Sequence, residues 1–169
     1  MKNMQDEIDQ LLSQFRKKCG IENSCGDLVG NLQAELKEAV EATEFAHKAE
    51  EFADIYIIAA NAVKQLGVTA TCSSGVHGVV VSHCADLIQD EIDFFTEAKV
   101  NGYGLGCIMQ DSKVAIELLG YNPEAVILEK CKLINTRTGK MNEEGTKWCK
   151  DKNQDPATLY KMDIEGCKL

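Results

Sequence analysis

Four carboxylates at helical spacing are the residues of this chain best suited to chemistry: Glu35 and Glu38, followed by Glu51 and Asp54. Each pair is spaced i, i+3, so its two side chains share one face of a helix. Four negative charges brought together would repel one another unless a cation neutralised them, and magnesium is a common hard cation for oxygen ligands. The spacing therefore predicts a metal site between helices, and such a site favours phosphate chemistry.

Glu51 and Asp54 carry most of this prediction. They lie in a helix expected over residues 47–66, whose apolar residues surround nearly the whole circumference and indicate a buried central helix. A buried carboxylate has to be paired, hydrogen-bonded or bound to a metal. We therefore expect a partner for both side chains, and a metal ion would serve both.

The residues around the four carboxylates admit simpler interpretations. A Glu-rich helix such as that expected over 27–46 usually presents a solvated face, and we expect Glu41 and Glu44 to be solvated. His47 is interpreted as a surface or hydrogen-bonding histidine, since magnesium prefers oxygen ligands. Asn61 projects to the same side as Asp54, where it could orient a metal-bound water, contact a sugar or pack between helices.

Apolar periodicity predicts an all-α fold with a four-helix-bundle-like core. A Ser/Thr/Gly loop is expected at 69–78, a turn at the glycine-rich segment 102–106, and an irregular polar tail after Gly139 with one turn near Asp155 and Pro156. Asn122 and Pro123 are a strong helix start. The expected helices cover residues 4–18, 27–46, 47–66, 79–100, 107–119 and 122–135.

Length and composition fit one globular domain: the chain has 169 residues, of which 44% are hydrophobic and 27% charged. We expect a helical domain over 1–138 and a polar extension over 139–169. The net charge of −9 argues against binding to nucleic acid through its phosphates. No apolar run approaches the roughly 20 residues of a membrane span, and the N-terminal segment lacks the apolar run of a signal peptide. We therefore expect no membrane partner and a cytoplasmic location.

Eight cysteines raise the question of disulfides or zinc. No two of them form a Cys-x-x-Cys pair, and the three histidines show no zinc-type spacing. Because cytoplasmic thiols are normally kept reduced, we expect free cysteines.

The acidic pattern resembles the signature of the MazG-like all-α nucleoside triphosphate pyrophosphohydrolases. Glu35-x-x-Glu38 is followed by a spacer of twelve residues, then by Glu51-x-x-Asp54 and an apolar helix. The alternative register, beginning at Glu38 and Glu41, leaves a spacer of only nine residues and is less suitable.

A second, shorter segment, residues 129–137, resembles the Lys-x-x-Asn-x-Arg element with which such proteins often close the catalytic domain. The resemblance implies that Lys132, Asn135 and Arg137 contact phosphates, with Lys130 as a neighbour. Asn61 joins them as a candidate substrate-binding residue.

The resemblance implies a hydrolase that converts an NTP or dNTP and water to the monophosphate and pyrophosphate. Glu35, Glu38, Glu51 and Asp54 would hold two or more Mg²⁺ or Mn²⁺ ions, and one of the glutamates could serve as general base; which one stays open. The Cys-, Gly- and Lys-rich ending from Gly139 is unlike that of a typical compact family member and suggests a viral or phage branch. Membership of that branch implies dATP or dGTP as substrate and, for a viral protein, the host cytoplasm. The family also implies a homodimer or homotetramer.

Two other functions remain open at the level of sequence. Phosphoribosyl-ATP pyrophosphohydrolases share a related helical fold and similar acidic motifs, and would ignore ordinary nucleotides. A non-catalytic helical interaction protein, in which the carboxylates merely make the surface acidic, would tolerate loss of the charges at Glu51 and Asp54.

Overall fold

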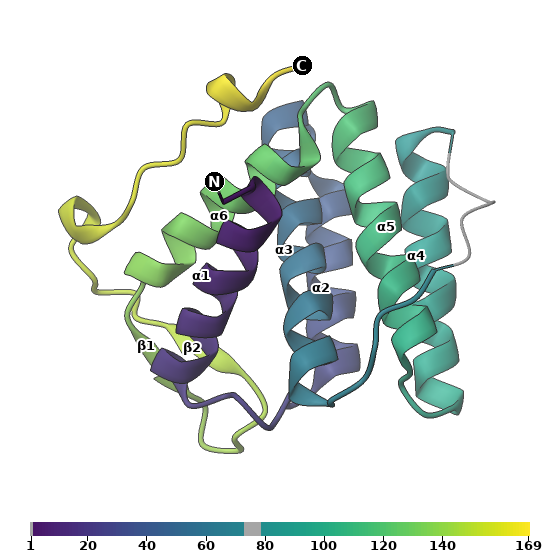
Figure 1. The fold of residues 1–169 in the computed structure, drawn as a ribbon, viewed down its shortest axis with the longest axis horizontal. Helices are drawn as coiled ribbons and strands as arrows, with labels where there is room; N and C mark the ends of the chain where they lie inside the picture. Colours follow the sequence, from purple (N-terminus) through teal and green to yellow (C-terminus); the bar gives the residue numbers. More distant parts are fainter. Residues whose placement is uncertain (1, 73–78) are drawn as a thin grey trace.

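The fold is all-α, as predicted. The computed structural model describes residues 2–72 and 79–169, and the helices in these residues form one bundle (Figure 1). The described helices are α1 (Met4–Cys19), α2 (Leu28–Glu41), α3 (Phe45–Gln65), α4 (Val81–Glu97), α5 (Gly102–Leu118) and α6 (Pro123–Thr136). None of the helices in the described residues is both long and apolar enough to cross a membrane.

Helix α3 occupies the centre of the bundle. It packs against α2, α5 and α6, while α4 packs on α2 and α5, and α1 lies along α6 (Figure 1). Its buried side chains, among them Phe52, Ile55 and Ala59, lie on all sides of the helix. The nearly complete apolar circumference in the sequence therefore corresponds to a central helix, and this arrangement carries Glu51 and Asp54 into the interior.

Several helix ends follow their sequence signals. Asn122 caps α6 by accepting a hydrogen bond from the backbone N–H of Ala125 at 3.1 Å, and Pro123 occupies the first turn. Asp27 caps α2 in the same way, through the N–H of Gly30 at 3.0 Å. Both caps satisfy backbone donors that a helix start leaves unpaired.

The expected helix over 27–46 was too long. Helix α2 ends at Glu41, where Ala42 adopts an extended backbone, and α3 already begins at Phe45. The Lys48 ammonium donates hydrogen bonds to the carbonyl oxygens of Ala39 and Val40, 2.6 and 3.2 Å away. A lysine from the next helix thus satisfies the end of α2, and this long-range cap has no signature in the local sequence.

The expected turn at 102–106 was wrong, because these residues form the first turns of α5. Asn101 caps the helix through the N–H of Gly104 at 2.8 Å. A side chain at Gly102 or Gly106 would overlap the carbonyl oxygen of Thr69 or Thr71. The glycines therefore allow the backbone of residues 69–71 to pack closely on the helix and do not reverse the chain.

The loop expected at 69–78 falls partly on residues 73–78, outside the described residues. The following helix begins at Val81 rather than at 79 and ends at Glu97 rather than at 100. The extended backbone at Val80 and Ala98 sets these two ends.

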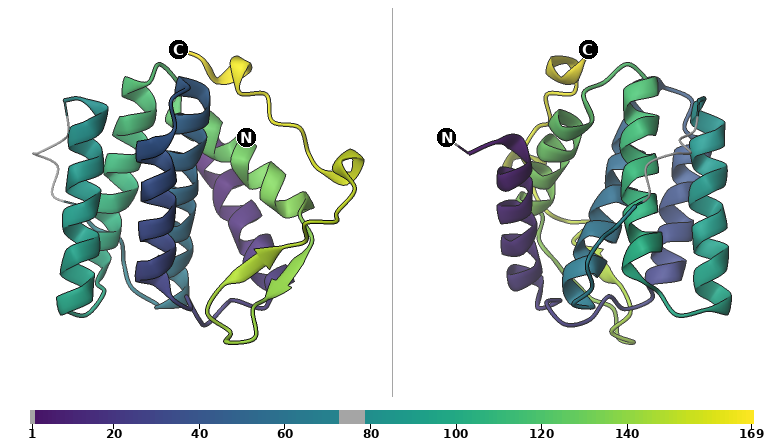
Figure 2. Two further views of the ribbon diagram at one scale, coloured as in Figure 1. Left: turned by 180° about the vertical axis from the view of Figure 1, so that it is seen from behind. Right: turned by 45° about the vertical axis from the view of Figure 1, so that its right-hand side comes forward.

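The C-terminal tail is mostly irregular, but it contains one antiparallel hairpin of β1 (Gly139–Met141) and β2 (Trp148–Lys150). The expected turn near Asp155 and Pro156 is a short 3₁₀ helix over Pro156–Thr158. A second 3₁₀ helix, Glu165–Cys167, precedes the C-terminus. The tail runs back along α6 to its start, where Asn122 N–H donates to the carbonyl oxygen of Cys167 at 2.8 Å (Figure 2).

Candidate metal centre and adjoining pocket

Three of the four predicted carboxylates meet in one cluster. Glu35 and Glu38 of α2 and Glu51 of α3 each contribute a carboxylate oxygen, and these oxygens lie within 4.8 Å of one another. Because residues 42–44 join the two helices by a short connection, the i, i+3 pair on α2 faces the first turns of α3. We call Glu35, Glu38 and Glu51 the acidic cluster.

Glu51 is the most constrained member of the acidic cluster. Its residue exposure is only 6%, and among the residues that the structure describes its Oε2 has no hydrogen-bond partner. The other oxygen lies 3.4 Å from Nδ1 of the exposed His47. An unsatisfied buried carboxylate oxygen is costly, and a divalent cation shared with Glu35 and Glu38 would satisfy it. The donor set, all carboxylate oxygen, fits Mg²⁺ or Mn²⁺.

The pKa values of Glu35 and Glu51 also agree with a cation site. Burial raises the pKa of Glu35 to about 8, and the negative charges of Asp54, Glu38 and Glu51 act in the same direction. Burial and the charge of Asp54 also raise the pKa of Glu51. These raised pKa values favour protonated carboxyl groups at Glu35 and Glu51 in the absence of a cation, and a bound cation would compete with the protons.

The fourth predicted carboxylate, Asp54, lies beside the acidic cluster and is paired with a lysine. The Nζ of Lys130, from α6, lies 2.9 Å from Oδ2 of Asp54. Burial alone would lower the pKa of Lys130, but the charge and hydrogen bond of Asp54 outweigh it and raise that pKa, with the Arg137 charge opposing them. Asp54 thus has a lysine as its counter-ion, whereas Oε2 of Glu51 has no partner in the described residues.

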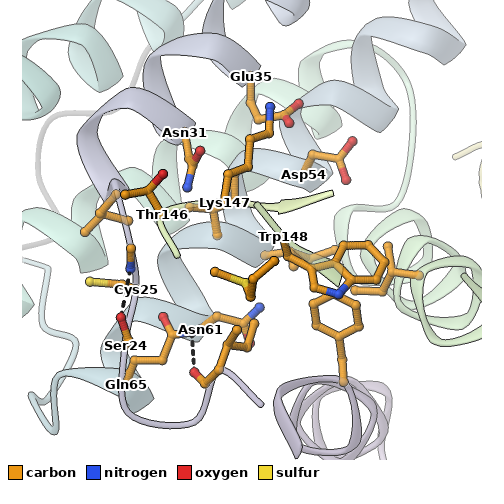
Figure 3. A pocket seen from close by; sticks show the side chains of 18 of the residues that line it. Ser24, Cys25, Asn31, Glu35, Asp54, Asn61, Gln65, Thr146, Lys147 and Trp148 are labelled. Carbon is orange, nitrogen blue, oxygen red and sulfur yellow. Dashed lines mark hydrogen bonds between the residues drawn. The ribbon is translucent and has the colours of Figure 1, made fainter. Parts of the chain in front are cut away.

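A pocket of about 200 Å³ adjoins the acidic cluster (Figure 3). Glu35 and Asp54 lie at one end, while Ser24, Asn61 and Gln65 lie at the other. Its lining comes from α1, α2, α3 and α6, from the segment between α1 and α2, and from the hairpin. The hairpin residues are Met141, Thr146, Lys147 and Trp148.

The four predicted substrate-binding residues separate into two groups. Asn61 and Arg137 line the pocket. Asn135 does not; its Nδ2 donates to the carbonyl oxygens of Leu11 and Cys131, at 3.0 and 2.9 Å. Lys132 also lies outside the lining, with its Nζ 3.1 Å from a Glu129 carboxylate oxygen and 5.8 Å from the centre of the Tyr160 ring.

Three residues in this region were not among the predicted site residues. Asn31 lines the pocket one helical turn before Glu35, a spacing that could have assigned it to the same face of α2. Lys147 extends toward Glu35 from the hairpin (Figure 3). Lys130 was noted only as a neighbour, and nothing in the local sequence indicates that it pairs with Asp54.

Comparisons of the chain with protein-family models, with curated proteins and with solved structures found no match. Function is therefore argued from the acidic cluster and the pocket.

Proposed function

We propose that this protein is a metal-dependent nucleoside triphosphate pyrophosphohydrolase that converts an NTP or dNTP and water to the monophosphate and pyrophosphate. The observation that carries the proposal is the buried Glu51 oxygen, which has no hydrogen-bond partner in the described part of the chain and lies within an all-carboxylate cluster beside a pocket. The resemblance in the acidic motif supports the same activity and favours purine deoxynucleotides.

In this proposal Glu35, Glu38 and Glu51 hold Mg²⁺ or Mn²⁺, and Asp54 is a further ligand or orients one. The bound ions would neutralise phosphate charge and make a water molecule more acidic. A cluster glutamate that is not fully engaged would accept the proton of that water. Arg137, which also lines the pocket, would bind phosphate oxygens with its guanidinium at the end with Glu35 and Asp54.

Lys130 and Lys147 would supply further positive charge at this end. Lys130 holds Asp54 in place at 2.9 Å, and Lys147 reaches from the hairpin toward Glu35 (Figure 3). Charge develops on the phosphoryl oxygens in the transition state, and fixed cations near them stabilise it. The chain therefore contains a carboxylate side for metal ions and a basic side for phosphates.

The proposal includes self-association into a homodimer or homotetramer. Large apolar side chains are exposed at Val40, Phe45, Leu66 and Phe94. Exposed apolar surface of this kind can mark a protein contact. Light scattering on the purified protein would give the number of subunits.

The decisive experiment is a substrate panel. Each canonical NTP and dNTP is incubated with Mg²⁺, with Mn²⁺ and with EDTA, and monophosphate, diphosphate and pyrophosphate are resolved. We expect metal-dependent release of monophosphate together with pyrophosphate, lost in Glu51→Gln and retained in Glu41→Gln. If no nucleotide were cleaved with either metal, the proposal would be refuted. Hydrolysis of phosphoribosyl-ATP or a non-catalytic role would then be the next function to test.

A further inference from the structure

The hairpin of β1 and β2, which follows α6, forms one wall of the pocket. The backbone N–H of Asp27, at the start of α2, donates to the carbonyl oxygen of Thr146 at 3.0 Å. Gly26 allows this approach: its φ is +58°, and a side chain there would overlap the Thr146 carbonyl. The Trp148 ring meets the Phe15 ring of α1 edge to face, with centroids 5.4 Å apart. The hairpin is thus fixed to two helices across the pocket.

Hydrogen bonds within the hairpin fix the conformation of its turn. The Asn142 side chain accepts a hydrogen bond from the Thr146 N–H at 2.9 Å, and its Nδ2 donates to the Thr146 hydroxyl at 3.0 Å. These contacts hold Thr146, Lys147 and Trp148 in one arrangement over the pocket (Figure 3).

The size of the pocket restricts what it can hold. Its volume of about 200 Å³ lies below the roughly 300–1,000 Å³ usual for pockets that enclose a whole drug-sized ligand. A complete nucleoside triphosphate is larger than such a ligand, so only one part of it would be enclosed. Among the labelled lining residues, the carboxylates of Glu35 and Asp54 lie at one end (Figure 3), which leaves the opposite end for an uncharged part of the ligand.

That opposite end presents amide groups. Asn61 accepts a hydrogen bond from Arg16 at 2.8 Å through its Oδ1, which turns its Nδ2 away from the arginine. Gln65 donates through its Nε2 to the Ile21 carbonyl oxygen at 2.7 Å and keeps its Oε1 as an acceptor. Asn31 lines the same pocket between this end and Glu35 (Figure 3), and in the described residues its side chain makes no hydrogen bond. Asn61 thus offers an uncharged donor, Gln65 an acceptor, and Asn31 both. Such groups match the donors and acceptors on the edge of a nucleobase.

We infer that this pocket is the nucleoside subsite of the proposed enzyme: the hairpin forms its roof, Trp148 offers an aromatic face, and Asn31, Asn61 and Gln65 select the base. The inference rests on the proposed function for the identity of the ligand. It assigns the base to the amide end and the triphosphate chain to the acidic cluster. It also gives residues 139–150 a part in specificity.

Trp148 allows a direct test, because it is the only tryptophan of the chain. The probes are the four deoxynucleoside 5′-monophosphates, titrated in EDTA while indole fluorescence is recorded, with ribose 5-phosphate and pyrophosphate as base-free controls. We expect a saturable change whose dissociation constant depends on the base, and none with the two controls. Equal responses to ribose 5-phosphate and to the monophosphates, or no response to any monophosphate, would overturn the inference.

Asn31→Leu keeps the approximate volume and removes the amide. We expect it to weaken binding of the preferred monophosphate about tenfold, the effect of losing one ordinary hydrogen bond. Gln14→Ala, an exposed amide on α1, and Cys149→Ser, which neighbours Trp148 on the opposite face of β2, are the matched controls. Unchanged affinity in Asn31→Leu would contradict a role for its amide in selecting the base.

The two proposals can fail separately. Base-dependent binding in EDTA without any hydrolysis would leave the nucleoside subsite standing and refute the hydrolase. Hydrolysis of nucleotides without base-dependent fluorescence would leave the hydrolase standing and refute the subsite.

Discussion

The ammonium of Lys130 lies 2.9 Å from a carboxylate oxygen of Asp54 and joins α6 to the central helix α3. The side chains of Lys130 and Asp54 are 6% and 20% exposed, so this is a largely buried ion pair beside three further carboxylates. Removing one partner of such a pair leaves an uncompensated charge in the interior. The pair therefore ties the stability of the bundle to the site.

The first prediction concerns this lysine. Lys130→Met should lower the free energy of unfolding by about 3–5 kcal/mol in EDTA, because Asp54, whose side chain is only 20% exposed, would lose its counter-ion beside three other carboxylates. Lys132→Met is the matched control: the Lys132 side chain is 35% exposed, and Glu129 would keep its hydrogen bonds from Tyr160 and Asp163, so the loss should cost less than about 1 kcal/mol. Urea unfolding of both variants is the measurement, and equal losses would contradict a special role for Lys130.

The second prediction concerns metal binding at Glu51. In the unsubstituted protein, Mg²⁺ or Mn²⁺ at a hundredfold excess over its dissociation constant should add about 2.7 kcal/mol of stability, or about 5–10 °C in Tm. Glu51→Gln should abolish this gain and leave stability in EDTA unchanged or higher, because a neutral amide replaces a repelled carboxylate.

Differential scanning calorimetry in EDTA and in each metal would measure the two effects. Glu41→Gln, an exposed position on α2 outside the acidic cluster, should keep the full metal response. A Glu51→Gln protein that metal stabilises as strongly as the parent would refute binding through the cluster.

Local periodicity predicted most of the fold. Helices α1, α3 and α6 begin and end within about two residues of their expected limits, because apolar stripes and caps are read from neighbouring residues. The acidic cluster could be predicted for the same reason: i, i+3 spacing and a short connection bring Glu35, Glu38 and Glu51 together. The roles of these residues in catalysis remain a prediction.

The rest of the site depends on contacts between distant parts of the chain. Lys130 and Asp54 lie on different helices, and no local pattern distinguishes Lys130 from Lys132. The hairpin has strands of only three residues and is held by its contacts to α1 and α2 rather than by apolar alternation. Its place over the pocket could not be derived from the tail sequence alone.

The third prediction follows from the glycines of α5. In most helices Gly→Ala is stabilising by about 1 kcal/mol, but Gly106→Ala should be destabilising by about 1–3 kcal/mol because the new methyl group would overlap the Thr71 carbonyl. Gly30→Ala in α2 is the comparison: there the methyl group meets the Asp27 side chain, which can rotate away at the cost of the α2 cap, about 1 kcal/mol, whereas the Thr71 backbone cannot. Thermal unfolding of both variants is the measurement. An equal change in stability at the two positions would contradict the idea that Gly106 is required for close packing against Thr71.

The fourth prediction is a pH dependence at Glu129, which anchors the tail to α6. Burial opposes ionisation of this carboxyl, but hydrogen bonds from the Asp163 N–H at 2.8 Å, from the Tyr160 hydroxyl and from Lys132 outweigh it and lower its pKa. Because the folded state favours the carboxylate, this contribution to stability is complete above the ordinary carboxyl pKa. It is lost as the pH falls through the lowered value.

Glu129→Gln should therefore cost about 1–3 kcal/mol at pH 7, where the parent carboxylate accepts all three hydrogen bonds. The difference between parent and variant should shrink below about pH 4.5, the ordinary value for this group, as the parent carboxyl also becomes neutral. Urea unfolding at pH 7, 5.5, 4 and 3 would measure it, with Glu165→Gln, an exposed tail carboxylate paired with Lys168, as the control. A difference that stays constant from pH 7 to 3 would show that packing of the tail, rather than the charge of Glu129, holds it against α6.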